Sequence, residues 1–139
     1  MDPRCTEACR AIFLPREYCV ADLSVSVAAL CPDQAVRGRC LVTLRDHVTE
    51  LFQLTPAMRT AFLEDVARVA EALFRTVAPV KINYALLGNV VPHMHWHIIP
   101  RFREDGLYPR PIWVADRPRV LLPAGERGEL IAAIRSHLR

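Results

Sequence analysis

The stretch GNVVPHMHWHIIPR, from Gly88 to Arg101, decides the fold class of this chain and points to its chemistry. Its apolar residues and the proline near its end predict a strand from Val90 to Arg101. Three of the five histidines in the chain stand at alternate positions here: His93, His95 and His97. Because alternate side chains of a strand share one face, we expect the imidazoles on one side. The opposite side is expected to pack in the core through Met94, Trp96 and Ile98.

A row of imidazoles along a strand is suited to phosphoryl chemistry. Rings spaced by roughly 6.5–7 Å can reach different oxygens of an extended anion such as a polyphosphate. With an unperturbed pKa of about 6.5, one neutral ring can attack phosphorus while a protonated neighbour donates to the leaving oxygen. The alternative is a metal site, but the nearest carboxylates, Glu104 and Asp105, lie beyond the strand. The pattern therefore favours phosphoryl chemistry over metal binding.

Outward from this strand, the sequence predicts a small sheet and two helices. Short apolar strands are expected in three more segments: residues 18–30, which hold two, 39–44 and 80–87. Thr55 and Pro56 predict the start of a long amphipathic helix that Pro79 ends. A second helix is expected from Glu126 onward. Since the connections are too short for parallel crossovers, we predict an α+β fold, an antiparallel sheet of about five strands covered by the two helices.

Composition narrows the class of protein. A chain of 139 residues with 52% apolar and 24% charged residues is typical of one globular domain. We therefore predict a single domain over residues 1–139, with an N-terminal segment 1–17 and a C-terminal extension 106–139 that carries a helix. A net charge of +3 without a basic run argues against a nucleic-acid partner. Charged residues near the N-terminus leave no signal peptide, and no uninterrupted apolar span exists, so we expect a cytoplasmic protein without membrane contact.

The stretch from Gly88 to Arg101 closely resembles the signature of the histidine-triad (HIT) family, His-x-His-x-His followed by two apolar residues. The resemblance extends over most of the first hundred residues, in the order of the predicted elements. Residues 107–113, LYPRPIW, are similar to a C-terminal segment of bacterial diadenosine polyphosphate hydrolases of that family. The family forms twofold dimers, so the resemblance also implies a homodimer, for which Trp96, Ile98 or Trp113 would supply apolar surface.

The resemblance implies a hydrolase or transferase that acts on the α-phosphorus of an adenine nucleotide derivative. His95 would attack phosphorus and form a covalent nucleotidyl-histidine, which water then hydrolyses. His97 would contact phosphate oxygens and assist the leaving group. His93 would orient the array, because its carbonyl fixes the tautomer of His95. Substrates of this type are dinucleoside polyphosphates and nucleoside phosphoramidates. Two other functions stay open: a nucleotide-binding or signalling module with little turnover, and a metal-binding protein that uses the histidine cluster.

Several residues are candidates for substrate binding by the same resemblance. The side-chain amide of Asn89 would lie near the phosphates, although Asn also suits a turn after Gly88. The amide of Asn83 is a further candidate, with a local structural role as its alternative. Asp33 is our choice for the ribose-binding acid, among the neighbouring positions Cys31, Pro32 and Asp33. Trp113 would stack on a base or pack in an interface.

Metal binding is the remaining question. The five cysteines are an odd number and are interpreted as reduced thiols. Some relatives bind structural zinc through an N-terminal Cys-x-x-Cys pair and two histidines, which here would be Cys5, Cys9, His47 and His93. The spacing of this pair is Cys-x-x-x-Cys, so we favour free thiols and no metal site. No cofactor is expected to be required, apart from a divalent cation bound with the nucleotide.

Overall fold

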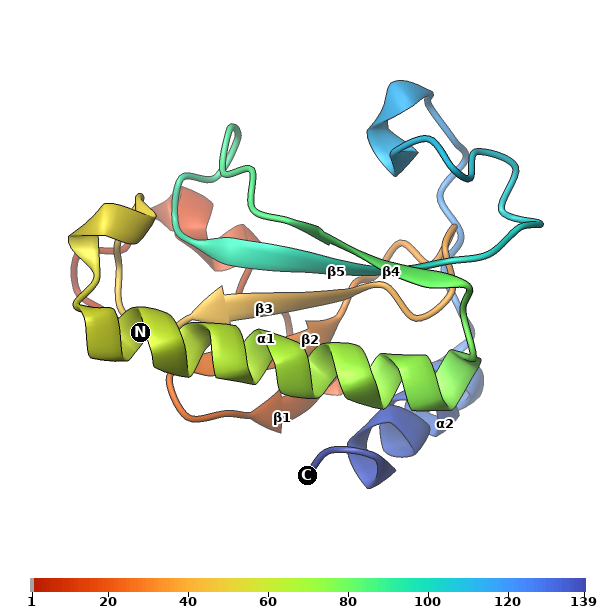
Figure 1. Ribbon diagram of the computed structural model, residues 1–139, viewed down its shortest axis with the longest axis horizontal. Coiled ribbons are helices and arrows are strands. Elements are labelled where there is room, and N and C mark those ends of the chain that lie inside the picture. The colour runs from red at the N-terminus through yellow and green to blue at the C-terminus, as the bar shows by residue number, and fades with distance from the viewer. Residues whose placement is uncertain (1) are drawn as a thin grey trace.

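Residues 2–139 are described by the computed structural model, which contains one antiparallel sheet with its two helices on the same face (Figure 1). The order of strands in the sheet is β1-β2-β3-β5-β4, and every neighbouring pair is antiparallel. The strands are β1 (Cys19–Asp22), β2 (Ser26–Leu30), β3 (Cys40–Leu44), β4 (Lys81–Ala85) and β5 (His95–Arg101). The predicted α+β fold with five strands is confirmed.

The long helix α1 (Pro56–Val77) begins and ends where the sequence indicates. The hydroxyl of Thr55 accepts a hydrogen bond from the N–H of Met58, at 3.2 Å, and satisfies one of the free donors of the first turn. The helix ends at Ala78 in a left-handed conformation (φ 48°), directly before Pro79. The second helix, α2 (Ala124–Ser136), packs beside α1. Four short 3-10 helices complete the fold: η1 (Glu7–Ala11), η2 (Arg16–Tyr18), η3 (Leu51–Gln53) and η4 (Ile112–Val114).

The hydrophobic core lies between α1 and one face of the sheet. Val42 and Ile98, on the central strands, are fully buried with Val69 and Leu73 of α1. Full burial of each such side chain contributes about 1.5–3 kcal/mol. Trp96, on the same face of β5, packs edge-on against Phe62 of α1 in this core, with 6.5 Å between ring centroids. Ile98 is therefore not available as dimer surface, and Trp96 packs inward.

The opposite face of the sheet carries the histidines. The register pairs Leu41 of β3 with His97 and Thr43 with His95, so these side chains share the face that points away from α1. The N-terminal residues with η1 lie near the start of β5, whereas the segment with η4 lies near its other end (Figure 1). None of the helices formed by the described residues is long and apolar enough to cross a membrane.

The strand predicted from Val90 begins later than expected. β5 starts at His95, and the preceding residues form a loop. Pro92 has no N–H for a ladder. The backbone of Met94 makes isolated bonds, donating to Val48 and accepting from Leu44, both at 3.1 Å. The prediction that all three imidazoles share a strand face is therefore wrong for His93, which precedes the strand.

A buried ion pair reverses the chain after β5. Arg101 is fully buried, and its Nε donates to Oδ2 of Asp105 at 2.9 Å. The other oxygen of Asp105 accepts from the N–H groups of Leu107 and Tyr108, at 2.9 and 2.7 Å. Burial alone would raise the pKa of Asp105, but these bonds outweigh it and hold the pKa well below its usual value. The pair thus directs the C-terminal extension back across the histidine face.

Candidate active site

His95 is held in the tautomer that a nucleophile needs. Its Nδ1 lies 2.7 Å from the carbonyl oxygen of His93, and because a carbonyl only accepts, Nδ1 carries the proton. The lone pair of a neutral His95 ring is then on Nε2. The side chain is nearly buried, with 6% of its surface exposed, and lies opposite Thr43 of β3. This matches the orienting role that the resemblance implies for the His93 carbonyl.

His97 lies next to His95, with 5.1 Å between ring centroids. Nη2 of Arg39 lies 3.1 Å from Nδ1 of His97, and since a guanidinium only donates, Nδ1 accepts and the proton of the neutral ring is on Nε2. Burial, the charge of Arg39 and the neighbouring His95 lower the pKa of His97 to about 3. His97 is therefore a neutral ring that can donate one hydrogen bond from Nε2.

His93 turns away from the other two histidines. Its ring is fully buried, and its Nε2 donates to the carbonyl of Leu44 at 2.6 Å. Phe13 packs edge-on against it at 5.1 Å. Burial is the largest cause that lowers the pKa of His93. With the proton on Nε2, the lone pair on Nδ1 points toward the N-terminal segment.

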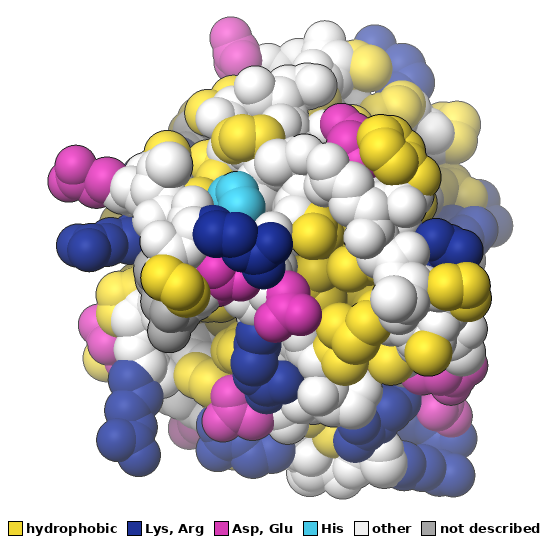
Figure 2. Space-filling view, turned by 90° about the vertical axis from the view of Figure 1, so that its left-hand side faces the viewer, with side chains coloured by type: hydrophobic (Ala, Val, Ile, Leu, Met, Phe, Trp, Pro, Cys, Tyr) yellow, Lys and Arg dark blue, Asp and Glu magenta, His cyan; other side chains and the backbone are white. Residues whose placement is uncertain are grey.

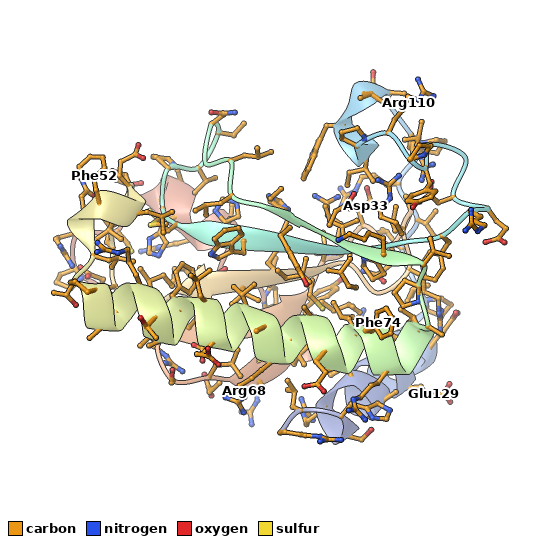
Figure 3. All side chains as sticks on the ribbon, viewed as in Figure 1. Asp33, Phe52, Arg68, Phe74, Arg110 and Glu129 are labelled. Carbon is orange, nitrogen blue, oxygen red and sulfur yellow. The ribbon has the colours of Figure 1, made fainter. Side chains whose placement is uncertain are left out.

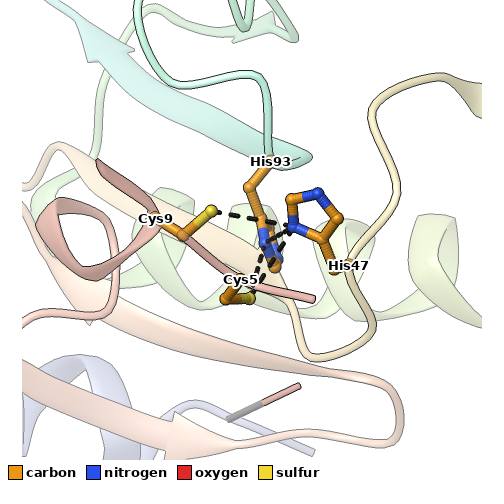
Figure 4. Close-up of side chains that lie close together, drawn as sticks. All are labelled: Cys5, Cys9, His47 and His93. Carbon is orange, nitrogen blue, oxygen red and sulfur yellow. Dashed lines mark hydrogen bonds between the residues drawn. The ribbon is translucent and has the colours of Figure 1, made fainter. Parts of the chain in front are cut away.

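That lone pair lies within a cluster of four side chains, Cys5, Cys9, His47 and His93 (Figure 4). Their donor atoms all lie within 4.8 Å of one another. Nδ1 of His93 is 3.1 Å from Nδ1 of His47 and 3.4 Å from Sγ of Cys5. Nδ1 of His47 is 3.7 Å from each of the two sulfur atoms. The cysteine spacing is no obstacle, because both sulfurs lie within reach of the same imidazole nitrogen of His47.

These distances fit a tetrahedral zinc site. Zn–N bonds of about 2.0–2.1 Å and Zn–S bonds of about 2.3 Å give N–N edges of about 3.3 Å and S–N edges of about 3.6 Å. The N–N spacing of 3.1 Å and three S–N spacings of 3.4–3.7 Å lie close to these edges, and the other pairs lie within 4.8 Å. Within residues 2–139, this is the one group of three or more His, Cys, Asp or Glu side chains with such close donor atoms. These four side chains could therefore hold a metal ion, and the expectation of free thiols stays a prediction.

The predicted binding residues lie at different places. Asp33 lies at one end of the sheet under the C-terminal extension, and Phe52 marks the opposite end (Figure 3). Oδ1 of Asp33 accepts from the N–H groups of Ala35 and Val120, at 3.0 and 3.1 Å, so it joins two loops. Asn89 is exposed and lines a hollow with η3, near Phe52. Their binding roles stay predictions.

Asn83 has a structural partner. Its side-chain oxygen accepts a hydrogen bond from Nη1 of the buried Arg101, at 2.8 Å. This satisfies part of the guanidinium that also pairs with Asp105. The alternative of a local structural role for Asn83 is therefore supported, and a substrate contact stays a prediction.

Two features were missed from the sequence. Arg39 contacts His97, and its position two residues before Leu41, the register partner of His97, is the signal that locates it on this face. An apolar cleft of about 250 Å³ lies beside Thr43, between the N-terminal segment and β2. Its lining residues include Ile12, Phe13, Leu14, Val27 and Ala29. This cleft depends on how the N-terminal segment folds over the sheet, and no motif marks it.

The surface at the end of the molecule near η3 and the N-terminal segment has mixed character. Figure 2 shows hydrophobic side chains there, interspersed with basic and acidic ones, and one histidine that reaches the surface. A continuous basic patch is not seen on this face.

Comparison with known proteins gives consistent relatives. Residues 16–104 match the family described as HIT domain. Protein hit of Bacillus subtilis is 27% identical over 96 residues, which are 65% of this chain and 61% of that protein, so the match spans less than two thirds of the relative. A histidine triad protein from Bradyrhizobium japonicum has a similar structure, with a TM-score of 0.80, 29% identity, and coverage of 89% of this chain and 93% of that one. A zinc-bound histidine triad family protein from Mycobacterium smegmatis shares the fold, with a TM-score of 0.64, 22% identity, and coverage of 93% and 89%.

Proposed function

The chain belongs to the HIT domain family, and on this premise we propose that it hydrolyses adenine nucleotide derivatives at the α-phosphorus through His95. HIT proteins bind nucleotides and are often nucleotide hydrolases. The observation that carries the proposal is the hydrogen bond from Nδ1 of His95 to the His93 carbonyl, because it leaves Nε2 as the free lone pair. The substrate class consists of dinucleoside polyphosphates and nucleoside phosphoramidates.

In the first step, Nε2 of His95 attacks the α-phosphorus. An N–P bond forms, the bond from phosphorus to the leaving group breaks, and its electron pair goes to the leaving atom. The ring becomes cationic, and its proton stays on Nδ1, hydrogen-bonded to the His93 carbonyl, which stabilises the charge. His97 donates from Nε2 to a phosphate oxygen, where negative charge develops.

In the second step, water attacks the same phosphorus. The P–N bond breaks, its electron pair returns to Nε2 of His95, and one proton of the water goes to solvent. The product is the nucleoside monophosphate. Two displacements with a good leaving group each replace one difficult displacement. A divalent cation bound to the phosphates would enter together with the substrate.

The purine base occupies the apolar cleft beside Thr43. The cleft lies on the histidine face, because Thr43 pairs with His95 across the sheet and with Val27 on its other side. Its volume of about 250 Å³ and its mostly apolar lining, which also includes Arg16, suit a planar ring. Replacing Ala29, which lines the cleft, by Leu would fill part of it and raise KM more than it lowers kcat.

The test of the proposal is the covalent intermediate. Rapid quenching without acid during turnover of a dinucleoside polyphosphate should give a nucleotidyl adduct on His95 by mass spectrometry. His95→Ala should lose more than about 10³-fold in kcat, since the nucleophile is removed. His137→Ala, a change of an exposed histidine, is the matched control. Full turnover by His95→Ala would refute the role of His95, and tight nucleotide binding with background turnover would favour a binding or signalling module.

A second proposal concerns the four-residue cluster: Cys5, Cys9, His47 and His93 hold a structural zinc ion. Its support is the match of their spacings to a tetrahedral site, together with the zinc-bound relative from Mycobacterium smegmatis. The metal would tie the N-terminal segment to the residue whose carbonyl orients His95. It would stabilise the fold without contacting substrate.

Metal analysis tests this second proposal. Protein purified without chelator should contain about one zinc ion per chain, as expected for a closed four-ligand site. Cys9→Ser should lose the metal and several degrees of thermal stability, while Cys19→Ser, on β1 and outside the cluster, should keep both. Wild-type protein that takes up no zinc after reconstitution would refute the metal site.

The homodimer stays a prediction. β4 lies at the edge of the sheet, where its backbone groups have no strand on one side. Tyr84, on this strand, has 49% of its surface exposed. We propose that a second copy pairs along β4. Light scattering after size exclusion measures the molar mass in solution, which shows whether the chain is a dimer.

A further inference from the structure

Building on the proposed hydrolase, we propose that Arg39 is a specificity-determining residue: it favours substrates whose leaving group is a phosphate chain over those whose leaving group is an amine. A phosphate chain leaves as an anion that a guanidinium can bind. An amine leaves only after it gains a proton. The surroundings of Arg39 favour the release of a phosphate chain and disfavour the release of an amine.

Arg39 is fixed beside the catalytic histidines by two contacts. Its Nη2 donates to Nδ1 of His97 at 3.1 Å. Its guanidinium carbon lies 5.5 Å from the ring centroid of Trp113, a cation–π distance. Trp113 in turn packs edge-on against His97, with 5.2 Å between ring centroids. The side chain is therefore held in one place, so less conformational entropy is lost when it binds an anion.

The guanidinium has donors to spare. Among residues 2–139, Nε of Arg39 is buried and has no hydrogen-bond partner. A buried donor without an acceptor is unfavourable, and an anion bound at the guanidinium would offset that penalty. Phosphate oxygens fit the forked donors of arginine best, because two parallel bonds form at once. The guanidinium therefore has hydrogen-bonding capacity left for a phosphate group.

Space for the leaving group adjoins Arg39. A cavity of about 240 Å³ lies between the Asp33 loop and the η4 segment, with Arg39 and Trp113 in its wall. The other charged residues of the wall are Asp33, Asp116 and Arg117. Oδ1 of Asp33 is occupied by two backbone N–H groups, and Asp116 is exposed to solvent. Arg39 lies in the wall of this cavity and also contacts His97, so an anion that leaves the α-phosphorus beside His97 can bind to Arg39.

The bond from Arg39 also prevents His97 from acting as an acid. The lone pair of Nδ1 already accepts from Nη2, so the second proton of an imidazolium has no free position. The nearby positive charge further disfavours that proton. A terminal phosphate, with a second pKa of about 6, departs with the electron pair of the broken P–O bond and needs no proton at neutral pH. A primary amine, with a pKa of about 10 in its protonated form, needs a proton on nitrogen as the P–N bond breaks.

The experiment compares two substrates that share the α-phosphorus. kcat/KM is measured for a dinucleoside polyphosphate and for an adenosine 5′-phosphoramidate of a primary alkylamine, with wild-type protein, Arg39→Gln and Arg39→Lys. Arg39→Gln should lower kcat/KM for the polyphosphate at least tenfold more than for the phosphoramidate, with Arg39→Lys in between. Arg37→Gln, which removes a neighbouring charge that pairs with Glu126 instead, should leave the ratio unchanged. Equal losses on both substrates would overturn the assignment.

A binding measurement separates this inference from the proposed hydrolysis. Inorganic tripolyphosphate carries the leaving-group chemistry without a nucleoside, and its affinity is measured by calorimetry. Arg39→Gln should bind it at least tenfold more weakly than the wild type and Arg37→Gln. If the wild type turns over neither substrate, the proposed hydrolysis fails, and this affinity alone decides the role of Arg39. Unchanged affinity in a folded Arg39→Gln variant would overturn it, and circular dichroism checks the fold.

Discussion

Asp105→Asn tests how the C-terminal extension is anchored over the histidine face. The carboxylate of Asp105 has only 3% of its surface exposed, and the partner Arg101 is fully buried. Oδ1 accepts from the backbone N–H groups of Leu107 and Tyr108. Oδ2 accepts from Nε of Arg101 and from the N–H of Phe102, at 2.9 and 3.3 Å. An asparagine has one oxygen for these two sets of donors, and its NH2 group would face the other set.

The expected loss follows from the uncompensated charge. Removing one partner of a buried ion pair typically costs about 3–5 kcal/mol, because the remaining charge stays buried. Arg101 keeps its hydrogen bond to the side-chain oxygen of Asn83 and, because it donates to both oxygens of Asp105, one to the remaining oxygen of the asparagine, which favours the lower half of this range. We therefore expect Asp105→Asn to lower the free energy of unfolding by about 3 kcal/mol and Tm by roughly 10 °C.

Urea unfolding at pH 7, followed by circular dichroism, measures this difference. Glu104→Gln is the matched control, because it makes the same chemical change at the adjacent, exposed acid and should cost less than about 0.5 kcal/mol. A loss below about 1 kcal/mol for Asp105→Asn, with an unchanged m-value, would refute the anchoring role.

The same variant has a defined pH dependence. The pKa of Asp105 is lower in the folded protein than its ordinary value, so its stabilisation is fully present above the unfolded pKa of about 3.9. It is lost as the pH falls through that value toward the folded pKa. The difference in stability between wild type and Asp105→Asn should therefore shrink below about pH 4. A difference that grows on acidification would contradict the sign of the pKa shift.

Three further stability predictions are measured by urea unfolding. Asp65→Ala should lower the free energy of unfolding by about 3–4 kcal/mol, because the buried carboxylate accepts from two backbone N–H groups and two serine hydroxyls of the β1–β2 turn. Asp22→Ala, on the same hairpin but exposed, should leave it nearly unchanged. Gly38→Ala should lower the free energy of unfolding by about 2 kcal/mol, because φ is +92° and the new Cβ would lie 3.1 Å from Cγ of Pro100. An unchanged urea midpoint would contradict this. Thr55→Ala should cost about 1 kcal/mol through the lost helix cap, with Thr55→Ser restoring most of it.

The fold was predictable where local signals and topology agree. Thr55 and Pro56 mark the start of α1 in the sequence, and the apolar stripe behind them faces the sheet as expected. The start of β5 was not predictable, because apolar residues alone do not distinguish a strand from an extended loop. Whether Val90 pairs with a neighbour depends on where β3 ends, and β3 ends at Leu44.

The site was predictable as a motif and only partly as an arrangement. Alternation correctly placed His95 and His97 on one face of a strand, with Trp96 and Ile98 on the other. It also predicted the same direction for His93, which instead turns toward the N-terminal segment.

The sequence by itself therefore determined the fold class, which follows from the strand pattern and from turn and cap residues. Its resemblance to the HIT family indicated the family and implied His95 as the attacking residue. Only the tertiary structure decided what surrounds that residue. Cys5 and His93 are 88 positions apart, and Arg39 and His97 are 58 apart, yet each pair is in contact. Such contacts arise when strands pair and segments fold across the sheet, and no local pattern encodes their distances. The close approach of the four side chains that could hold a metal ion and the placement of Arg39 on His97 are properties of the folded chain.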